Sequence, residues 1–545
     1  MDLLRIPDLQ ALEARAIAQA GPGVLMQRAA KAVARCATQR LRALPVQEPS
    51  APPLVLVCMG PGNNGGDALQ AGLLLIECGY RVVVLDLFDQ ARRPADAAAV
   101  LHVARRTAAL SWWSLEQTLA WLGGSASTGL VLDGLFGIGL RRAIDGPSAV
   151  LINALNARDC YRIQVLAIDL PSGLNADTGL PIDGGPVVRA DLTLTLLANK
   201  PGLHTGEAGR WCAEILLDTI GIDATAFREA GLSPGIGTLF DEALARPLAP
   251  RRARDVHKGR FGDLLVIQGA PSTQGAALLA LLGAQAVGAG RLYLGQDTLA
   301  PAPASHPEFM TRWVRPDHLG LADAIVIGCG LGQDARAQAL LAAVVASPLP
   351  CVLDADALNL LARGDSPNPP AGLTQGAPQS APQVDQPPTK SDSWTSRASS
   401  DCVMTPHPLE AARLLGCSVQ AIQADRIGSA QRIAAQYHCT VVLKGAGTVV
   451  ADSDGTWSIN ASGGPLLAVA GTGDVLAGVI GGLMAQGLSA PDAARLGVWL
   501  HGAAADALSS RPQWASGIGL PASELAGSIR ACVNRLAAPD GRYAG

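Results

Sequence analysis

Two short glycine-rich stretches of the chain each end in an aspartate that could take part in chemistry. One is GPGNNGGD, from Gly60 to Asp67, and the other is GTGD, from Gly471 to Asp474. An apolar, helix-like segment follows each stretch, and the free N–H groups at its start would attract an anion such as a phosphate. A carboxylate at the same place can accept a hydrogen bond or a proton. Both stretches therefore predict small-molecule sites.

The first stretch satisfies the G-x-G-x-x-G pattern of dinucleotide-binding turns, and Asp86 follows at the distance of a ribose-binding acid. Asp67 does not fit a bare pyrophosphate cradle, because like charges repel, and we expect it to accept hydrogen bonds from hydroxyl or amide donors. Asn63 and Asn64 offer amide oxygens that suit an alkali or alkaline-earth cation. The alternative for each of these residues is a helix cap with Asx turns.

Two further aspartates end apolar runs in the same half of the chain. Asp133 lies in LVLDGLFGIGL and Asp169 in AIDLPSGLNADTG, and a glycine turn follows each. The carboxyl ends of parallel strands meet at one edge of a sheet. We therefore expect both carboxylates to lie beside the Gly60 to Asp67 turn, where a carboxylate in a partly dry crevice can act as acid or base.

The second stretch has neighbours of matching chemistry. Gly471 to Gly473 can form an anion hole for a phosphoryl group, with Asp474 placed to take a proton from an attacking hydroxyl. Lys444, with Gly445 to Thr448, ends a strand-like run and suits nucleotide phosphates. His407 precedes a helix-like segment. The alternatives are a glycine-rich helix cap and, for His407, a polar core residue.

The elements that must position these residues read as α/β layers. Apolar residues make up 49% of the 545-residue chain, and its short apolar runs alternate with helix-like segments. Such runs are typical of parallel strands that are covered on both faces. In the first half they are LVLVCMG, RVVVLDLF, GLVLDGLFG, YRIQVLAIDLPSG, ADLTLTLLA and CAEILLDTIG. In the second half they are GDLLVIQGA, GRLYLG, DAIVIGCGLG, PCVLDADALNLL and TVVLKGAGTVVAD.

Length and composition predict two domains. We place the first at residues 1–224, a connection at 225–254 and the second domain at 255–545. Residues 363–401 are rich in Pro, Ser, Gln and Asp, so we expect a disordered surface insertion, with a functional loop as the alternative.

Charge and targeting signals narrow the partners. The formal net charge is -4 and no Lys/Arg block stands out, which argues against nucleic-acid and membrane partners and favours a small molecule. The eleven cysteines form no C-x-x-C pair, and the N-terminus lacks the pattern of a signal peptide. We therefore expect a cytoplasmic protein, and its many apolar helices favour a homo-oligomer.

The motifs of the first half resemble the epimerase domain of NAD(P)H-hydrate repair enzymes. The resemblance rests on GPGNNGGD, LDGLFGIGL, AIDLPSGLNADTG and NKPGLHTGEAGRW and runs to about Gly221. It implies a Rossmann-like three-layer domain with a parallel sheet, and a potassium ion near Asn64, Asp133 and Ser172. The residues that it implies for binding hydrated NADH or NADPH are Asn63, Asn64, Gly65, Gly66, Asp67, Gly137, Ile138, Gly139, Leu140, Arg141, Arg142, Ala143 and Asp169. We assign the acid/base role to Asp169.

The second half resembles the ADP-dependent NAD(P)H-hydrate dehydratases, which are ribokinase-like α/β proteins. The matching motifs are HKGRFGDLLVIQGAPSTQGAALLA, GCGLG, VLDADALNLL, TPHPLE, KGAGT and AGTGD. The resemblance implies that the hydrate binds at Ala276, Gly330, Gly332, His407 and Asp474. It implies that the nucleotide binds at Lys444, Gly445, Ala446, Gly447, Thr448 and Gly473.

Together the two resemblances predict a bifunctional enzyme. An epimerase would interconvert the R and S hydrates, and a dehydratase would consume the S form with ADP and Mg²⁺, releasing AMP and phosphate, after Asp474 activates the C6 hydroxyl. The alternatives are a ribokinase-like small-molecule kinase with an accessory nucleotide-binding domain, a non-catalytic N-terminal binding module, and a simple dehydrogenase. The carboxylates Asp133 and Asp169 disfavour the second alternative, and the lack of a hydride-accepting substrate site disfavours the third.

Overall fold

The computed structural model describes residues 1–44, 53–88, 91–125, 127–222, 236–269, 273–297, 305–363 and 401–538. The insertion expected at 363–401 lies outside these residues except for its two ends, and so does 225–235 of the expected connection. The chain divides into two compact units, Met1–Thr238 and Leu239–Gly545. The rest of the expected connection carries β9 (Gly237–Phe240), which spans this division, and the short helix α9 (Glu242–Ala245).

The first unit is built on a fully parallel sheet with the strand order β4-β3-β2-β5-β6-β7-β8. Its strands are β2 (Leu54–Met59), β3 (Arg81–Asp86), β4 (Ser111–Trp113), β5 (Gly129–Gly134), β6 (Ile163–Ile168), β7 (Ala190–Leu196) and β8 (Cys212–Asp218). Its helices are α1 (Ile6–Ala20), α2 (Val24–Ala43), α3 (Asn63–Glu77), α4 (Ala95–Ala104), α5 (Leu115–Leu122), α6 (Gly146–Ala157) and α7 (Ala208–Trp211). The short strand β1 (Asp2–Leu3) pairs with the start of β9.

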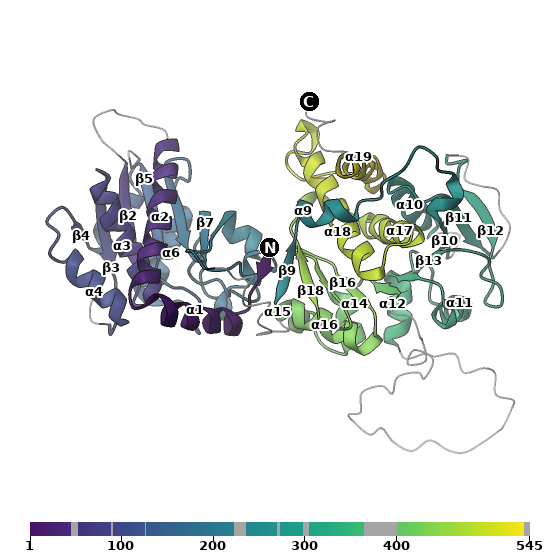
Figure 1. Cartoon of the computed structure of the whole chain (residues 1–545), viewed down its shortest axis with the longest axis horizontal. Helices are drawn as coiled ribbons and strands as arrows, with labels where there is room; N and C mark the ends of the chain where they lie inside the picture. Colours follow the sequence, from purple (N-terminus) through teal and green to yellow (C-terminus); the bar gives the residue numbers. More distant parts are fainter. Residues whose placement is uncertain are drawn as a thin grey trace, which may run out of the picture. The chain divides into compact units, whose positions relative to one another are not determined.

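Two separate apolar cores cover the two faces of this sheet. Val55, Val57 and Met59 of β2 pack with α2 and α3, whereas Leu54, Leu56 and Cys58 pack with α5 and α6. Because side chains alternate along a strand, a continuous apolar run fills both cores at once. The three-layer α/β fold expected for this half is confirmed, and Figure 1 shows its sheet between the purple and blue helices.

The second unit has a mixed sheet. Strands β12, β11, β10, β13, β14, β15 and β16 run parallel in that spatial order, and β17 and β18 continue it antiparallel. Their bounds are β10 (Asp263–Ile267), β11 (Arg291–Gln296), β12 (Met310–Trp313), β13 (Ala324–Ile327), β14 (Cys351–Leu353), β15 (Cys402–Met404), β16 (Thr440–Leu443), β17 (Val449–Ala451) and β18 (Trp457–Asn460).

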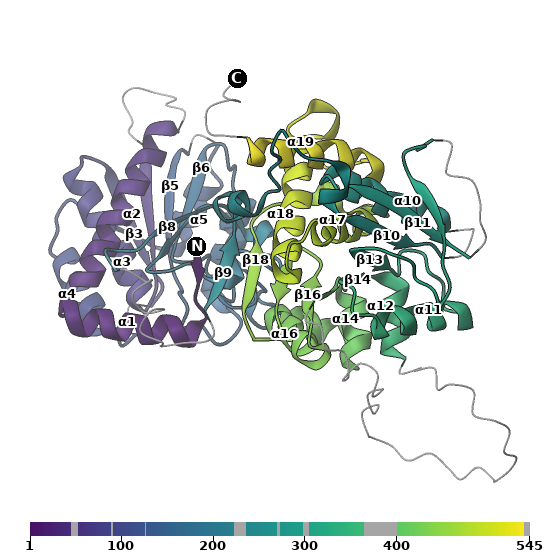
Figure 2. The same cartoon turned by 45° about the vertical axis from the view of Figure 1, so that its right-hand side comes forward.

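Helices cover both faces of the second sheet, as Figures 1 and 2 show. One face carries α10 (Gln274–Ala286), α17 (Thr472–Ala485), α18 (Ala490–Ser509) and α19 (Leu525–Ala537), which share one large apolar core with the sheet. The other carries α11 (Ala335–Ala346), α12 (Ala355–Ala362), α14 (Pro408–Leu415), α15 (Val419–Ala424) and α16 (Arg426–Tyr437). The α/β fold predicted for this half is therefore also confirmed. Among the described residues, no helix has both the length and the apolar character needed to cross a membrane.

Candidate active sites

A cavity of about 680 Å³ lies in the first unit where β2, β5 and β6 end. Helix α1 and the start of α2 form its other wall. Most residues that the resemblance assigns to hydrate binding line this cavity: Asn63, Asn64, Asp67, Gly137, Ile138, Gly139, Leu140, Arg141, Arg142 and Asp169. Ala143 and the buried Gly65 and Gly66 do not line it.

The glycine turn allows α3 to start close to the end of β5. A Cβ atom on Gly60 would lie 1.7 Å from the Leu135 carbonyl oxygen, and one on Gly65 would lie 2.2 Å from the Gly60 carbonyl oxygen. Only glycine tolerates such approaches. The turn therefore brings the first residues of α3 to the cavity, where the free N–H groups of this helix can bind an anion.

Asp86 has a structural partner. Its carboxylate accepts hydrogen bonds from Arg93 at 2.7 and 2.8 Å, and both side chains are only 3% exposed. Arg93 also donates to the Gly60 carbonyl oxygen at 2.6 Å. Asp86 therefore stabilises the glycine turn through Arg93, and it is not among the residues that line the cavity.

Asp169 is held by a buried lysine. Lys200 Nζ lies 2.6 Å from Asp169 Oδ1 and donates to Thr195 Oγ1 at 2.8 Å, with the lysine side chain 1% exposed. The Leu196 N–H also donates to Asp169 Oδ1, at 3.1 Å. Asp169 has a φ of 70°, in the left-handed region that is uncommon for a residue with a side chain. The ion pair and these bonds fix the carboxylate at the cavity wall.

Two other carboxyl groups face the same cavity. Burial raises the pKa of Asp67 well above its usual value, and the charges of Asp169 and Glu13 raise it further. Burial and Asp169 also raise the pKa of Glu13 on α1. Both effects favour the protonated form of Asp67, which can donate a hydrogen bond or a proton as well as accept one.

Asp133 lies beneath the cavity and does not line it. Its carboxylate accepts from the Ser172 hydroxyl at 2.6 Å and from the Ser172 N–H at 2.9 Å. Ser172 Oγ also accepts from the Phe136 N–H at 2.9 Å, which ties the loop after β5 to the loop after β6. Burial raises the pKa of Asp133 to about 6, against the lowering effect of the Ser172 bonds.

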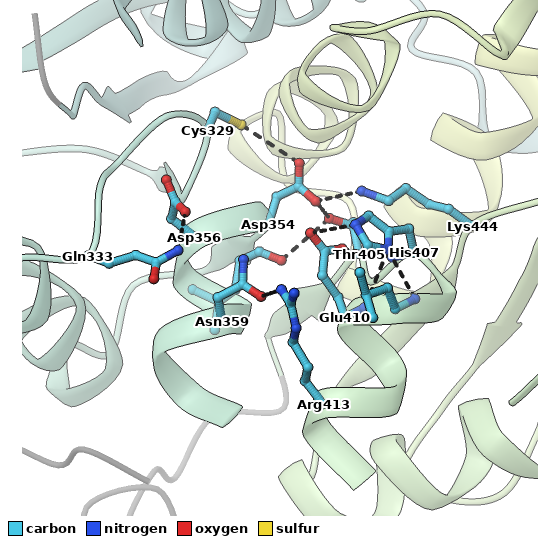
Figure 3. Close-up of polar contacts among 12 residues, drawn as sticks. Cys329, Gln333, Asp354, Asp356, Asn359, Thr405, His407, Glu410, Arg413 and Lys444 are labelled. Carbon is cyan, nitrogen blue, oxygen red and sulfur yellow. Dashed lines mark hydrogen bonds and ion pairs between the residues drawn. The ribbon is translucent and has the colours of Figure 1, made fainter. Parts of the chain in front are cut away.

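In the second unit, three polar residues directly follow three neighbouring strands. Asp354 follows β14, Thr405 follows β15 and Lys444 follows β16. Asp354 Oδ1 accepts from the Thr405 hydroxyl at 2.7 Å and from Lys444 Nζ at 2.7 Å (Figure 3). Attraction to Asp354 and Glu410 outweighs burial and raises the pKa of Lys444.

Asp474 and Cys329 complete this group. One ligand-type atom from each of Cys329, Asp354 and Asp474 lies within 4.8 Å of the other two. Burial, followed by the charge of Asp354, raises the pKa of Asp474 to about 6, against a hydrogen bond from Cys329 and the charge of Lys444. Asp474 belongs to the first turn of α17, and this turn has free N–H groups. A base and an anion site therefore meet at one point.

His407 caps α14. Its Nδ1 accepts from the N–H groups of Leu409 and Glu410 at 3.1 and 3.3 Å, and Glu410 in turn accepts from the His407 N–H at 2.8 Å. Burial and the charge of Lys444 lower the pKa of His407. The ring is half-buried, and its Nε2 lies 3.3 Å from Glu410 Oε1, so both ring nitrogens have partners within α14. Figure 3 shows it beside Lys444 and Thr405.

The remaining predicted residues lie on turns and helix starts of the second unit. Ala276 is half-buried in the first turn of α10, and the Thr273 hydroxyl just before this helix donates to the Gly330 carbonyl oxygen at 2.6 Å. Gly332 N–H donates to Asp356 at 2.9 Å. Gly445 and Ala446 are exposed, and the Thr448 hydroxyl closes their turn by donating to the Gly445 carbonyl oxygen at 3.0 Å. A Cβ atom on Gly473 would lie 3.4 Å from Lys444 Nζ.

Four residues of these sites were not assigned from the sequence. They are Glu13 and Lys200 in the first unit and Asp354 and Thr405 in the second. A polar residue directly after a fully apolar strand was the available signal for Asp354 and Thr405. Lys200 stood in a quoted motif, but its burial against Asp169 could not be read from its neighbours.

Comparison with known proteins places the chain in a family. The profile of the YjeF-related protein N-terminus matches residues 22–202, and that of NAD(P)H-hydrate dehydratase matches residues 264–373 and 386–528. The bifunctional NAD(P)H-hydrate repair enzyme Nnr of Coxiella burnetii is 35% identical over 487 residues, which are 88% of this chain and 90% of the relative. The Escherichia coli enzyme of the same name is 37% identical over 463 residues, 84% of this chain and 81% of the relative.

One solved structure is an ADP/ATP-dependent NAD(P)H-hydrate dehydratase from Bacillus subtilis, co-crystallised with ATP and Mg²⁺. It is 29% identical, with a TM-score of 0.44, and the match covers 55% of this chain and 99% of that one. The extent of the sequence relatives decides the assignment: the chain belongs to the family of bifunctional NAD(P)H-hydrate repair enzymes, with an epimerase domain followed by a dehydratase domain.

Proposed function

We propose that the first unit epimerises the C6 hydroxyl of hydrated NADH and NADPH through Asp169 and Asp67, and that the second unit dehydrates the S epimer with ADP through Asp474. One observation supports both assignments. At the strand ends of each unit, a carboxyl group with a raised pKa lies beside an aspartate that is paired with a lysine. Such shifts place a proton donor or acceptor within reach of neutral pH.

Epimerisation requires one proton acceptor and one donor. In the hydrate, C6 carries both the hydroxyl group and the ring nitrogen, so it is a hemiaminal carbon. Asp169 would accept the hydroxyl proton while the protonated Asp67 gives a proton to the ring nitrogen. The C6–N bond then opens to an aldehyde, the aldehyde rotates, and the reverse steps close the ring on its other face. On ring closure Asp169 returns its proton to the C6 oxygen and Asp67 regains a proton from the ring nitrogen, so both groups end in their starting protonation states.

The rest of the dinucleotide would lie along the cavity rim. The start of α3 offers free N–H groups and a partial positive charge to the pyrophosphate. Arg141 and Arg142 are exposed and line the same cavity, so their guanidinium groups can approach phosphate oxygens. An additional 2′-phosphate would find the same arginines, which agrees with a site that accepts both NADH and NADPH hydrates.

Dehydration needs the C6 hydroxyl to become a better leaving group. Asp474 would accept the hydroxyl proton as the oxygen attacks the β-phosphorus of ADP, which gives AMP and a C6 phosphate ester. Lys444 and the first N–H groups of α17 would hold the phosphoryl oxygens. Breaking the C6–O bond and losing one proton from C5 then restores the C5=C6 double bond of NAD(P)H and releases phosphate.

A potassium ion fits beneath the epimerase cavity. Asp133 is a fully buried carboxylate, and the Asn64 side-chain amide, whose buried Nδ2 has no partner among the described residues, can offer its oxygen Oδ1 as a ligand. Asn64 packs against the loop after β5, because a Cβ atom on Gly137 of that loop would lie 3.6 Å from Asn64 Cγ. Ser172 binds the same loop through the Phe136 N–H. Asn64, Asp133 and Ser172 would hold the ion. It would supply the positive charge that a buried carboxylate needs and would fix this loop.

Among the described residues of the second unit, magnesium finds no ready oxygen cage. The group Cys329, Asp354 and Asp474 contains a thiol, which Mg²⁺ disfavours, and Asp354 Oδ1 is occupied by Lys444 and Thr405. We therefore expect Mg²⁺ to arrive on the nucleotide phosphates and to be held chiefly by them.

The test is recovery of reduced-nicotinamide absorbance from a mixture of the R and S hydrates. With the purified chain, ADP, Mg²⁺ and K⁺, we expect recovery of the whole mixture, whereas Asp169→Asn should recover only the S fraction at early times. No recovery with ADP or ATP would contradict the proposal. Phosphorylation of an added stable alcohol, without recovery from the hydrates, would indicate a small-molecule kinase instead.

A further inference from the structure

We propose that Asp354 is a positioning residue of the dehydratase unit, which fixes Lys444 beside the start of α17 and places a negative charge against Asp474. This inference rests on the proposed function of Asp474 as the base. Asp354 itself is 2% exposed and is not a group that we expect to touch the substrate. Asp354 would act through its neighbours Lys444 and Asp474, which we expect to touch the substrates.

The position of the Asp354 carboxylate is set from three strands. Its own backbone N–H donates to the Ile327 carbonyl oxygen at the end of β13, at 3.1 Å. Its Oδ1 accepts from Thr405 after β15 and from Lys444 after β16, both at 2.7 Å. Figure 3 shows the carboxylate pointing to Lys444 on one side and to Cys329 on the other. Contacts with the ends of parallel strands therefore fix the position of the Asp354 carboxylate.

Lys444 is fixed at both ends by the same arrangement. Its backbone N–H donates to the Pro406 carbonyl oxygen at 2.9 Å, and its Nζ is held by Asp354. A Cβ atom on Gly473 would lie 3.4 Å from that Nζ and 3.9 Å from Asp354 Oδ2. The ammonium group therefore lies directly against the first turn of α17, where an anion would bind. Without Asp354, a lysine side chain has enough rotatable bonds to leave this place.

Asp354 also acts on Asp474 through its charge. The charged and titratable groups that face Asp474 come from several elements: Asp354 at the start of α12, Cys329 after β13, Lys444 after β16 and, behind Lys444, Glu410 on α14 and His501 on α18. Asp354 raises the pKa of Asp474, and Lys444 and the Cys329 hydrogen bond lower it. The balance leaves Asp474 with a pKa of about 6, so it is ionised at neutral pH and yet a stronger base than an ordinary aspartate.

The inference predicts opposite shifts for the two members of the ion pair. Dehydration should increase with pH as Asp474 ionises, with a midpoint near pH 6 in the native protein. In Asp354→Asn a negative charge is lost, so the midpoint should move down by about one pH unit, the lower range for a like charge at this separation. The rate at saturation should also fall, because Lys444 is released. In Lys444→Met the midpoint should move up.

The experiment is a pH profile of the dehydration rate at saturating S hydrate and ADP. Asp354→Glu keeps the charge and should retain the native midpoint. Thr405→Val removes a hydrogen bond to the same carboxylate without changing any charge, and it should also retain the midpoint. Epimerisation by each variant, measured on the same full-length chain, verifies that the protein is folded.

The results separate this inference from the proposed function. A lower rate with an unmoved midpoint in Asp354→Asn would mean a purely structural role and would overturn the proposal, as would native activity at every pH. If the native protein itself dehydrates no hydrate, the assignment of Asp474 fails first. An Asp354→Asn protein with a lower midpoint, beside a Thr405→Val protein with a native one, supports the positioning role.

Discussion

Each unit pairs a lysine with a strand-end aspartate, the fully buried Lys200 in the first and the partly buried Lys444 in the second. The two pairs differ in which carboxyl group remains accessible to the substrate. In the first unit, Lys200 lies 2.6 Å from Asp169, and Asp169 itself lines the cavity. In the second, Lys444 lies 2.7 Å from Asp354, which is buried, and the half-buried neighbour is Asp474.

The difference matches the proton demands of the two reactions. Epimerisation needs a base and an acid at once, and the first unit offers a lysine-paired Asp169 with Asp67, whose pKa is raised well above its usual value. Phosphoryl transfer needs a base beside an anion site, and the second unit offers Asp474 with a pKa of about 6 at the start of α17. In the proposed mechanism, the same lysine–aspartate pairing would support an acid–base pair in one unit and a single base in the other.

The largest effect should come from removing the lysine of the first pair. Lys200→Met leaves Asp169 without its cation, and breaking a buried ion pair on one side costs about 3–5 kcal/mol. We also expect epimerisation to fall by roughly 100-fold or more, the usual scale of lost acid–base catalysis. Chemical denaturation followed by spectroscopy, together with an epimer-exchange assay, measures both effects.

Lys31→Met is the matched control, because Lys31 is exposed on α2. It should leave unfolding and epimerisation unchanged, and both variants should dehydrate the S hydrate at the native rate. Native epimerisation by Lys200→Met would show that the two lysine–aspartate pairs have no common role.

A smaller effect should come from the neutral analogue of Asp67. The pKa of Asp67 is higher in the folded protein than in the unfolded chain. The free energy of unfolding is therefore greatest below pH 4, where Asp67 is protonated in both states, and it decreases as the pH rises from there toward the folded pKa. Asp67→Asn cannot ionise. At pH 8 its free energy of unfolding should therefore exceed that of the native protein by an amount on the order of 1–3 kcal/mol, and its melting temperature should be higher. Both differences should disappear near pH 4.

Thermal unfolding scans between pH 4 and pH 8 provide the measurement. Glu77→Gln on the same helix is the control, since Glu77 is exposed and should show no such trend. An Asp67→Asn protein that is less stable than the native one at every pH would exclude a buried, protonated Asp67. Its epimerisation should be impaired in either case, because an amide is a poor acid.

The sequence predicted the layers of both units but not all of their strands. The apolar runs LVLVCMG and YRIQVLAIDLPSG predict β2 and β6, because each run fills two cores at once. By contrast, β4 (SWW), β12 (MTRW) and β18 (WSIN) contain polar residues, and β15 (CVM) has only three residues, so none of them stands out as an apolar run. Their place in a sheet is decided by pairing with longer neighbours.

The sites show the same limit at the level of single residues. Asp169 and Asp474 could be named because each stands at a strand end or helix start with glycines around it. The partners of these aspartates could not, because Lys200 and Asp354 become important only through contacts made in space; Asp354 and Lys444 are 90 residues apart. Asp86 shows that a matching spacing does not ensure a binding role. Its spacing from the glycine turn fits a ribose site, but its carboxylate is bound to Arg93.

The most direct test of the account mixes two damaged proteins. Asp169→Asn alone should recover reduced nicotinamide only from the S hydrate, and Asp474→Asn alone should recover none while still exchanging the epimers. An equal mixture of the two should recover the whole R and S mixture as fast as the native protein at the same site concentration. If the mixture recovers only the S fraction at early times, Asp169 and Asp474 do not serve two separate reactions in the two units, and the account is wrong.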